Sequence, residues 1–298
     1  MQRKIIKHGA TTILAALAMG AAGSSAWAGG ALDIDFDADN FDGSMSWITN
    51  LHWPLTPSSG AQTFTYVGGN DDECVVNKIY VDSEEIKDDF VGDYEDIIAQ
   101  VVLDQEWLVE LEEGEECNVF TPVGPENLTE RTFDWYAQDV FWNVWYMGEH
   151  SRSFEDGCPG PEVADEDVED EECFEGSWEA GQYGPEMEII AAPGIVVPSD
   201  YPSGGELIEP GTYYMQEVAE GAEDMAKILK VNSPLSVEDG VEPGDYDNCR
   251  KVKEWNPFEH GQSVEHKWYC LGGNGLVLIQ GIGGGPTENE VLVEITSD

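Results

Sequence analysis

Apolar and polar residues alternate in short runs along most of this chain, the period-two pattern of strands that bury one face. Gly and Pro separate the runs, and helical periods are few. The pattern predicts an all-β chain built as a single antiparallel meandering sheet or partial barrel, with few or no helices. The runs expected to form strands are 62–66, 74–81, 252–255, 265–271, 276–281 and 290–295.

The clearest hairpin is predicted over residues 132–148, where two aromatic-rich runs flank a turn near Trp142. Aromatic residues favour strands because they fit a pleated, half-buried surface. Residues 97–111 and 222–231 suit either a strand or a helix, and 193–217 alternate turns with short strands. No internal repeat of fixed period is visible, which weighs against a propeller or solenoid.

The first 28 residues have the three parts of a secretory signal peptide. Arg3, Lys4 and Lys7 form the positive start, 12–22 is a short apolar run, and a small-x-small cleavage signal ends at Ala28. That run is shorter than the roughly 20 residues that span a bilayer. We therefore expect an exported protein, periplasmic or extracellular, without membrane insertion.

Charge changes the picture most. The chain has 13 basic and 61 acidic residues, and the signal peptide contains three of the basic and none of the acidic ones. Cleavage therefore leaves a mature chain with a formal net charge of 10 − 61 = −51. Such a charge excludes general affinity for nucleic acid or anionic membranes. It permits bound cations, cationic partners, or a surface adapted to high salt. Ten Trp, 11 Tyr and 10 Phe supply a core, so the chain is not of the disordered class.

Composition divides the chain into a signal peptide (1–28), an acidic lead-in (29–45) and a β domain (46–298). Within the β domain, residues 154–176 form an insert with 11 acidic residues, expected as a surface loop.

Six cysteines in an exported protein predict three disulfides, for which 15 connectivities exist. Pairing neighbours along the chain is the preferred arrangement. It would close the acidic insert with its second bond and join two adjacent strands with its third. The expected pairs are Cys74–Cys117, Cys158–Cys173 and Cys249–Cys270.

Several stretches together resemble an uncharacterised family of exported, β-rich bacterial proteins. The most specific are Phe133-Asp134-Trp135-Tyr136-Ala137-Gln138-Asp139 and Asn143-Val144-Trp145-Tyr146-Met147-Gly148-Glu149. The segments 48–57, 177–181, 193–198, 222–226, 253–257 and 265–269 follow in family order, so the resemblance covers roughly 46–295. It implies one β-rich domain and no known reaction. Trp142 departs from the family pattern, which usually has Gly in this turn, and the acidic insert is an addition.

Calcium is the cofactor that the acidic segments suggest, because hard cations take six to eight oxygen ligands. The alternating aspartates of the lead-in could present several carboxylates on one face of an extended segment. The EF-hand pattern fails there, since Ala38 stands where Gly is needed and Ser44 where Glu is needed. A mobile acidic lead-in is the competing interpretation. The candidate metal ligands are Asp33, Asp35, Asp37, Asp39 and Asp42.

A second candidate site lies where carboxylates neighbour tryptophans in predicted strands, an arrangement that suits sugars or cations but also occurs at ordinary sheet edges. No GxSxG, HExxH or CxxC motif is present, so no catalytic residue is assigned. The residues of this candidate face are Trp178, Glu179, Glu217, Glu223, Asp224, Glu254, Trp255, Glu265 and His266.

Taken together, the sequence favours an exported non-enzymatic binding protein for calcium or another divalent cation. Two alternatives stay open: a carbohydrate-binding module or polysaccharide-active enzyme that uses the Trp and carboxylate face, and an extracellular structural component that assembles with cations. The expected partners are thus divalent cations or a cationic or glycan ligand.

Overall fold

The structure is a computed structural model. The residues it describes are 31, 32, 34, 36–41, 48, 50, 53, 60–69, 72–112, 114–155, 157–182, 191–204, 206–219, 224–237, 244–257, 264–271, 275–281 and 289–297. The signal peptide predicted over residues 1–28 lies outside them.

Fourteen strands form one antiparallel sheet that is not closed, which confirms the predicted all-β class. The helical elements described are four short 3-10 turns, η1 (Ala38–Asn40), η2 (Gly92–Tyr94), η3 (Asp165–Asp167) and η4 (Glu171–Phe174). The strands are β1 (Gln62–Gly69), β2 (Glu73–Lys87), β3 (Ala99–Glu110), β4 (Leu128–Gln138), β5 (Val144–Ser153), β6 (Trp178–Glu179), β7 (Ala191–Val197), β8 (Tyr213–Met215), β9 (Glu217–Ala219), β10 (Met225–Val237), β11 (Gly244–Trp255), β12 (Val264–Cys270), β13 (Gly275–Gly281) and β14 (Asn289–Ser297).

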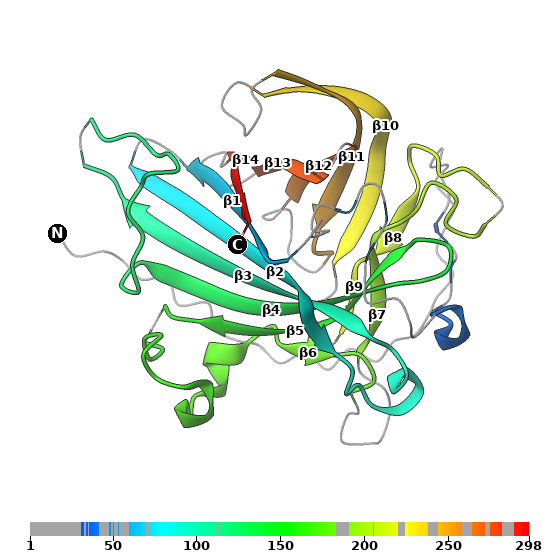
Figure 1. Cartoon of the computed structure of the whole chain (residues 1–298), viewed down its shortest axis with the longest axis horizontal. Coiled ribbons are helices and arrows are strands. Elements are labelled where there is room, and N and C mark those ends of the chain that lie inside the picture. Colours follow the sequence, from blue (N-terminus) through cyan, green and yellow to red (C-terminus); the bar gives the residue numbers. More distant parts are fainter. Residues whose placement is uncertain are drawn as a thin grey trace.

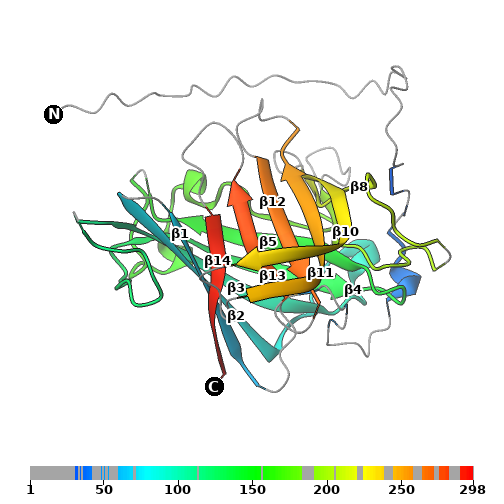
Figure 2. The same cartoon turned by 90° about the horizontal axis from the view of Figure 1, so that it is seen from above.

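Two meanders build this sheet, β1 to β5 and β10 to β14, and they join where β14 pairs with β1. The short strands β8 and β9 lie at opposite ends of the strand order, yet Gln216 alone separates them in sequence. One short segment therefore pairs with β10 on one side and with β7 on the other. Figure 1 shows the resulting curved sheet, and Figure 2 shows β10–β13 facing β2–β5 across its interior.

The apolar core fills much of the space that this curvature encloses. Phe64, Tyr66, Ile228 and Leu292 are each at most 1% exposed, and they come from both meanders. They point inward because alternate residues of a strand share one face. Burial of such side chains stabilises the fold by about 1.5–3 kcal/mol each.

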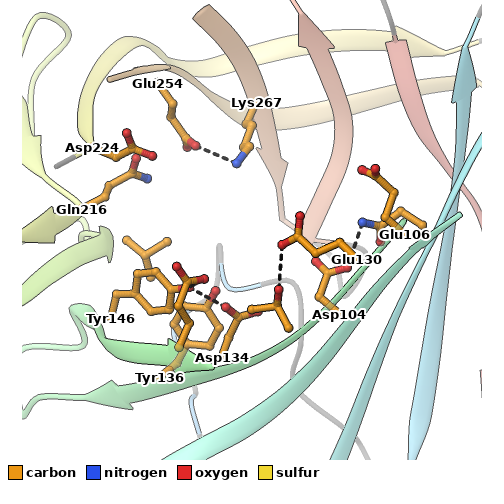
Figure 3. Close-up of a pocket in the computed structure, with 14 residues that line it drawn as sticks. Asp104, Glu106, Glu130, Asp134, Tyr136, Tyr146, Gln216, Asp224, Glu254 and Lys267 are labelled. Atoms are coloured by element: carbon orange, nitrogen blue, oxygen red, sulfur yellow. Dashed lines mark hydrogen bonds and ion pairs between the residues drawn. The ribbon is translucent and has the colours of Figure 1, made fainter. Parts of the chain in front are cut away.

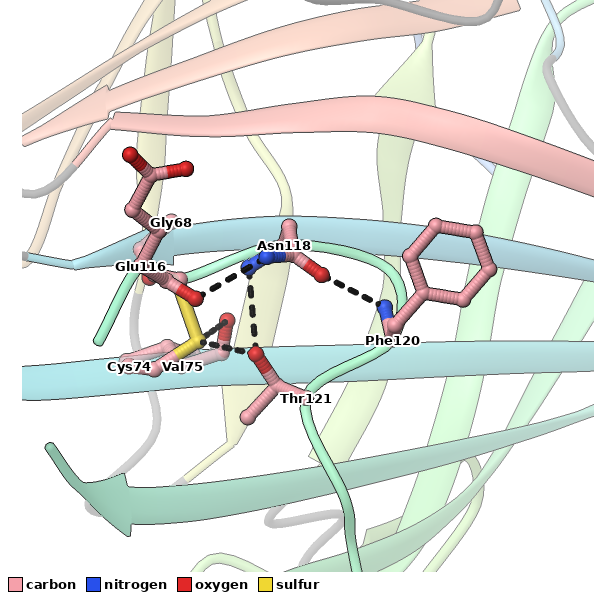
Figure 4. Close-up of a disulfide and its surroundings, with 8 residues drawn as sticks. Gly68, Cys74, Val75, Glu116, Asn118, Phe120 and Thr121 are labelled. Atoms are coloured by element: carbon pink, nitrogen blue, oxygen red, sulfur yellow. Dashed lines mark hydrogen bonds between the residues drawn. A yellow bond between two sulfur atoms is a disulfide. The ribbon is translucent and has the colours of Figure 1, made fainter.

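Three disulfides link neighbouring cysteines along the chain: Cys74–Cys117, Cys158–Cys173 and Cys249–Cys270. The first ties the β3–β4 loop to β2, where Asn118 donates its backbone N–H to Thr121 and accepts one from Phe120 (Figure 4). The third joins two directly paired residues of β11 and β12. Such bonds mark a protein exported to an oxidising compartment.

The acidic insert is held to the sheet by Asp165 and by backbone carbonyls of the insert that accept hydrogen bonds from Arg152. Asp165 binds Arg131 at 2.5 Å and also contacts Arg152, which is 1% exposed. These arginines hold the pKa of Asp165 below its usual value although burial opposes them. Among the described residues, no helix has the length and hydropathy to cross a bilayer.

Candidate functional site

An acidic cavity of about 280 Å³ lies inside the curved sheet, between the two meanders (Figure 3). Seven of its fourteen lining residues are carboxylates, and they come from strands far apart in sequence. The lining residues are Asn77, Asp104, Glu106, Glu130, Thr132, Asp134, Tyr136, Tyr146, Glu149, Val196, Gln216, Asp224, Glu254 and Lys267.

Strand periodicity builds the lower wall of this interior pocket. Glu130, Thr132 and Asp134 stand at alternate positions of β4 and so point to one face. The register between β3 and β4 puts the acids of β3 on the same face, because Asp104 lies opposite Thr132 and Glu106 lies opposite Glu130. The hydroxyl of Thr132 donates a 2.8 Å hydrogen bond to Glu130. Two neighbouring strands thus present one continuous acidic ladder.

The opposite wall carries the one cationic side chain among the described residues that line the pocket. Nζ of Lys267 on β12 lies 2.7 Å from Oε2 of Glu254 on β11. Tyr269 also donates its hydroxyl to Glu254, over 3.2 Å. Burial alone would lower the pKa of Lys267, but Glu254 and Glu265 hold it well above its usual value. Lys267 is therefore a fixed positive charge that serves one of the seven carboxylates.

Two carboxyl groups share the hydroxyl of Tyr146. Its oxygen lies 2.5 Å from Oδ1 of Asp134 and 2.8 Å from Oε2 of Glu149. A phenol has one hydrogen to donate, so it cannot give a full hydrogen bond to two ionised carboxylates at once. Burial, followed by the charge of Glu149, raises the pKa of Asp134 well above its usual range. The pair consequently retains a proton at a pH where free carboxyl groups are ionised.

Asp104 is a third carboxyl group whose ionisation the pocket opposes. Burial raises its pKa to about 7, and the charges of Glu130 and Glu106 add to this, although Asn77 donates a hydrogen bond to it. The side-chain oxygen Oδ1 of Asn77 is buried and has no hydrogen-bond partner among the described residues. The pocket thus contains negative charge and a vacant acceptor.

A groove of about 500 Å³ lies at the β5–β6 edge and shares one lining residue, Glu149, with the pocket. Trp135, Trp178 and Glu179 also line this groove. The ring of Trp178 packs edge-on against Tyr146 at 5.4 Å. Glu179 is ion-paired to Lys87 at 3.1 Å. Trp135 stands between Asp134 and Tyr136 on β4 and so points to the face opposite these two pocket residues.

The structure distributes the residues of the predicted Trp and carboxylate face over several places. Asp224 and Glu254 line the pocket, Trp178 and Glu179 line the groove, and Glu265 lies 3.5 Å from Lys267. On the opposite face of the sheet, Trp255 lies beneath Lys253, and His266 packs against Trp268. Burial, followed by Lys251 and Lys253, lowers the pKa of His266 to about 4. Glu223 lies outside the described residues, and Glu217 is placed only as the partner of Pro193.

The aspartate ladder of the lead-in can be followed only in part. Asp37 and Asp39 are exposed, while Asp33, Asp35 and Asp42 lie outside the described residues. The neighbouring Leu32, Ile34, Phe36 and Ala38 pack against the core, so the alternation here is that of an extended segment with one buried face. No group of three or more His, Cys, Asp or Glu able to hold a metal occurs within the described part of the chain. The calcium site stays a prediction.

Sequence reasoning missed most of the pocket, including Asp104, Glu106, Glu130, Asp134 and Glu149. Their signal is present as polar residues at alternate positions of two consecutive strands, Asp104 and Glu106 in β3 and Glu130, Thr132 and Asp134 in β4. That pattern ordinarily marks the solvent face of a half-buried sheet. Here the sheet curves around this face, which turns a polar surface into the lining of a cavity.

Comparisons with known proteins add little. No protein-family model and no curated protein matches this chain. A crystal structure of a lipoprotein candidate from Parabacteroides distasonis aligns with 83% of this chain and 99% of its own, at 10% identity and a TM-score of 0.29. A score this low supports no conclusion about fold or function.

Proposed function

We propose that this exported protein is a binding protein whose interior pocket takes a small organic cation with primary amino groups. The observation that carries the proposal is the charge imbalance of the pocket, where seven carboxylates face one ammonium group. Lys267 shows the recognition chemistry, since its ammonium is held by Glu254. A ligand ammonium would do the same for the carboxylates on the opposite wall.

The hydrogen-bonding groups support a donor ligand. An ammonium group has three N–H donors and no acceptor. Oδ1 of Asn77 is an acceptor without a donor among the described residues, and each carboxylate accepts several bonds. Beyond the pocket, the acidity of the whole chain raises the local concentration of cations and speeds their arrival.

An amine suits the pocket better than a bare metal ion. Calcium needs six to eight oxygens converging at about 2.3–2.6 Å. The carboxylates instead line a cavity of about 280 Å³, and none of the described ones are grouped as metal ligands. Calcium bound by the lead-in, a glycan on the tryptophan face and cation-dependent assembly stay predictions of the sequence.

Isothermal titration of residues 29–298 with putrescine, spermidine, calcium and magnesium tests the proposal. We expect one putrescine per chain, with at least tenfold weaker binding in Asp224→Asn and in Glu130→Gln. Asp37→Asn/Asp39→Asn is the matched control, because those exposed carboxylates lie outside the pocket. Absence of heat with either amine would overturn the proposal. Calcium binding that this control variant abolishes would instead place the cation at the lead-in.

A further inference from the structure

Four of the basic residues of the mature chain stand together on β10 and β11, on the face of the sheet opposite the interior pocket. They form two directly opposed cross-strand pairs, Lys227–Lys253 and Lys230–Lys251. Lys253 precedes Glu254 of the pocket in β11, so the two side chains point to opposite faces. Lys230 is exposed and the other three lysines are half-buried. These four residues are called the lysine face below.

A bulge in β10 brings the two pairs to one side. Residues three apart on a regular strand point to opposite faces, which would separate Lys227 from Lys230. The register of β10 against β11 shifts between Ile228 and Lys230, and the extra residue returns Lys230 to the face of Lys227. Like charges directly opposite each other destabilise a sheet. The fold therefore gathers positive charge here against repulsion, in a chain that has 61 acidic residues.

Three of these lysines have no acidic partner among the described residues. None of the ion pairs in that part of the chain involves Lys230, Lys251 or Lys253. Nζ of Lys251 lies 4.1 Å from the ring centre of Trp268 instead. Nζ of Lys253 lies 4.8 Å from that of Trp255. The indole rings attract these ammonium groups and favour fixed positions for them without neutralising their charge.

The potential at the lysine face is positive although the whole chain is acidic. Burial, followed by the charge of Lys230, lowers the pKa of Lys251. His266 lies opposite Lys253, and both neighbouring lysines add to the burial that lowers its pKa to about 4. Repulsion from distant carboxylates is screened beyond about 8 Å at physiological salt. An anion close to this face therefore meets the lysines before it meets the acids.

We infer that the lysine face binds an extended acidic segment of a partner protein, with carboxylates at alternate positions. Two residues of a strand span about 6.8 Å. This distance separates the two lysine pairs along β11, and it also separates alternate side chains of an extended peptide. Each pair can then hold one carboxylate between two ammonium groups. The face lies across the sheet from the interior pocket, so the inference is independent of the proposed function.

Calorimetric titration of residues 29–298 at low ionic strength tests the inference with a capped octapeptide that alternates Glu and Thr. We expect one peptide per chain. Binding should be at least tenfold weaker for the alternating Gln and Thr peptide, and for a peptide of the same composition with its Glu residues in one block. Lys251→Met/Lys253→Met should weaken the acidic peptide at least tenfold and leave putrescine within twofold. Lys78→Met is the matched control, because Lys78 also lies over a tryptophan ring, that of Trp107, outside the lysine face.

The double variant removes like-charge contacts, so it should stay folded by circular dichroism. Equal peptide affinity in this variant and the parent would overturn the inference, as would absence of heat with the acidic peptide. Equal binding of the block peptide would overturn the fit to alternate carboxylates. Tighter binding of a heparin oligosaccharide would reassign the face to a sulfated glycan. Concentration-dependent assembly of the parent in sedimentation, lost in the double variant, would reassign it to a second copy of this chain.

Discussion

Nζ of Lys267 lies 2.7 Å from Oε2 of Glu254, and this ion pair faces the acidic ladder of β3 and β4 across the interior pocket (Figure 3). Lys267 gives Glu254 the ammonium partner that, under the proposed function, the ligand gives to carboxylates on the opposite wall. Lys267 is the one lysine or arginine among the described lining residues. On the facing wall, hydroxyl groups donate hydrogen bonds to Glu106 and Glu130, and burial raises the pKa of Asp104, Asp134 and Glu149.

Replacing Lys267 with Met should leave Glu254 available to an ammonium group of the ligand. We expect Lys267→Met to lower the free energy of unfolding by about 1–3 kcal/mol, because Glu254 loses its ion-pair partner in a sheltered position. Putrescine should bind the variant several times more tightly than the parent and restore its melting temperature. Calorimetry and thermal melts measure both effects. Lys78→Met is the control, because Lys78 lies over the ring of Trp107 and does not line the pocket. Identical putrescine affinity in Lys267→Met and the parent would contradict the proposed pocket chemistry.

Stability should fall as the pH rises from 6 to 8. Burial raises the pKa of Asp104 to about 7, against roughly 3.9 in an unfolded chain. The folded protein then holds a proton that the unfolded chain has lost, so the stabilisation is lost as the pH rises through the folded pKa. We expect the free energy of unfolding, measured by urea titration at pH 6 and pH 8, to fall by about 1 kcal/mol less in Asp104→Asn than in the parent. An unchanged slope would refute the shifted pKa, and Asp37→Asn should keep the parent slope.

Putrescine binding should strengthen over the same pH range. Its amines stay protonated, while Asp104, Asp134 and Glu149 lose the protons that burial makes them retain. Binding should therefore release protons near pH 7, and affinity should rise severalfold between pH 6 and 8. Titrations in buffers of different ionisation enthalpy count the protons. Proton uptake on binding would run against the expectation.

The β4–β5 turn should prefer Gly at position 142. Trp142 has a φ of 70°, a left-handed conformation that costs most residues about 1–2 kcal/mol. The turn is held by buried Asp139, which accepts hydrogen bonds from Asn143 and from the indole of Trp145. We expect Trp142→Gly to be about 1 kcal/mol more stable than Trp142→Ala in urea unfolding. At Val140 we expect the opposite order, with Val140→Ala more stable than Val140→Gly. If the Gly variant were the more stable one at both positions, backbone strain at position 142 would not be the cause.

Asp165 should matter far more than its acidic neighbours in the insert. It holds both Arg131 and Arg152, and the latter is 1% exposed. Asp165→Asn should cost about 2–4 kcal/mol, because it leaves buried guanidinium charge without a counter-ion. Asp167→Asn, on an exposed residue of the same turn, should stay within about 0.5 kcal/mol. Equal effects in the two variants would mean that the insert is not anchored in this way.

The sequence by itself determined the strands, because alternation, aromatic content and Gly or Pro boundaries are local properties. It predicted the all-β class and the hairpin at 132–148, and it drew attention to Trp178, Glu179, Asp224 and Glu254. It left 97–111 and 222–231 open between strand and helix, and long-range pairing in the sheet made both strands.

Only the tertiary structure decided where the acids of those strands lie. A period of two separates the faces of a strand but does not say which face the sheet will enclose. The pairing of β14 with β1, more than 200 residues apart in sequence, and the attachment of β8 and β9 at opposite ends of the strand order set that curvature. Because the curvature places Asp104 and Asp134 opposite Glu254 and Lys267, residues that resemble a solvent face become the lining of a pocket.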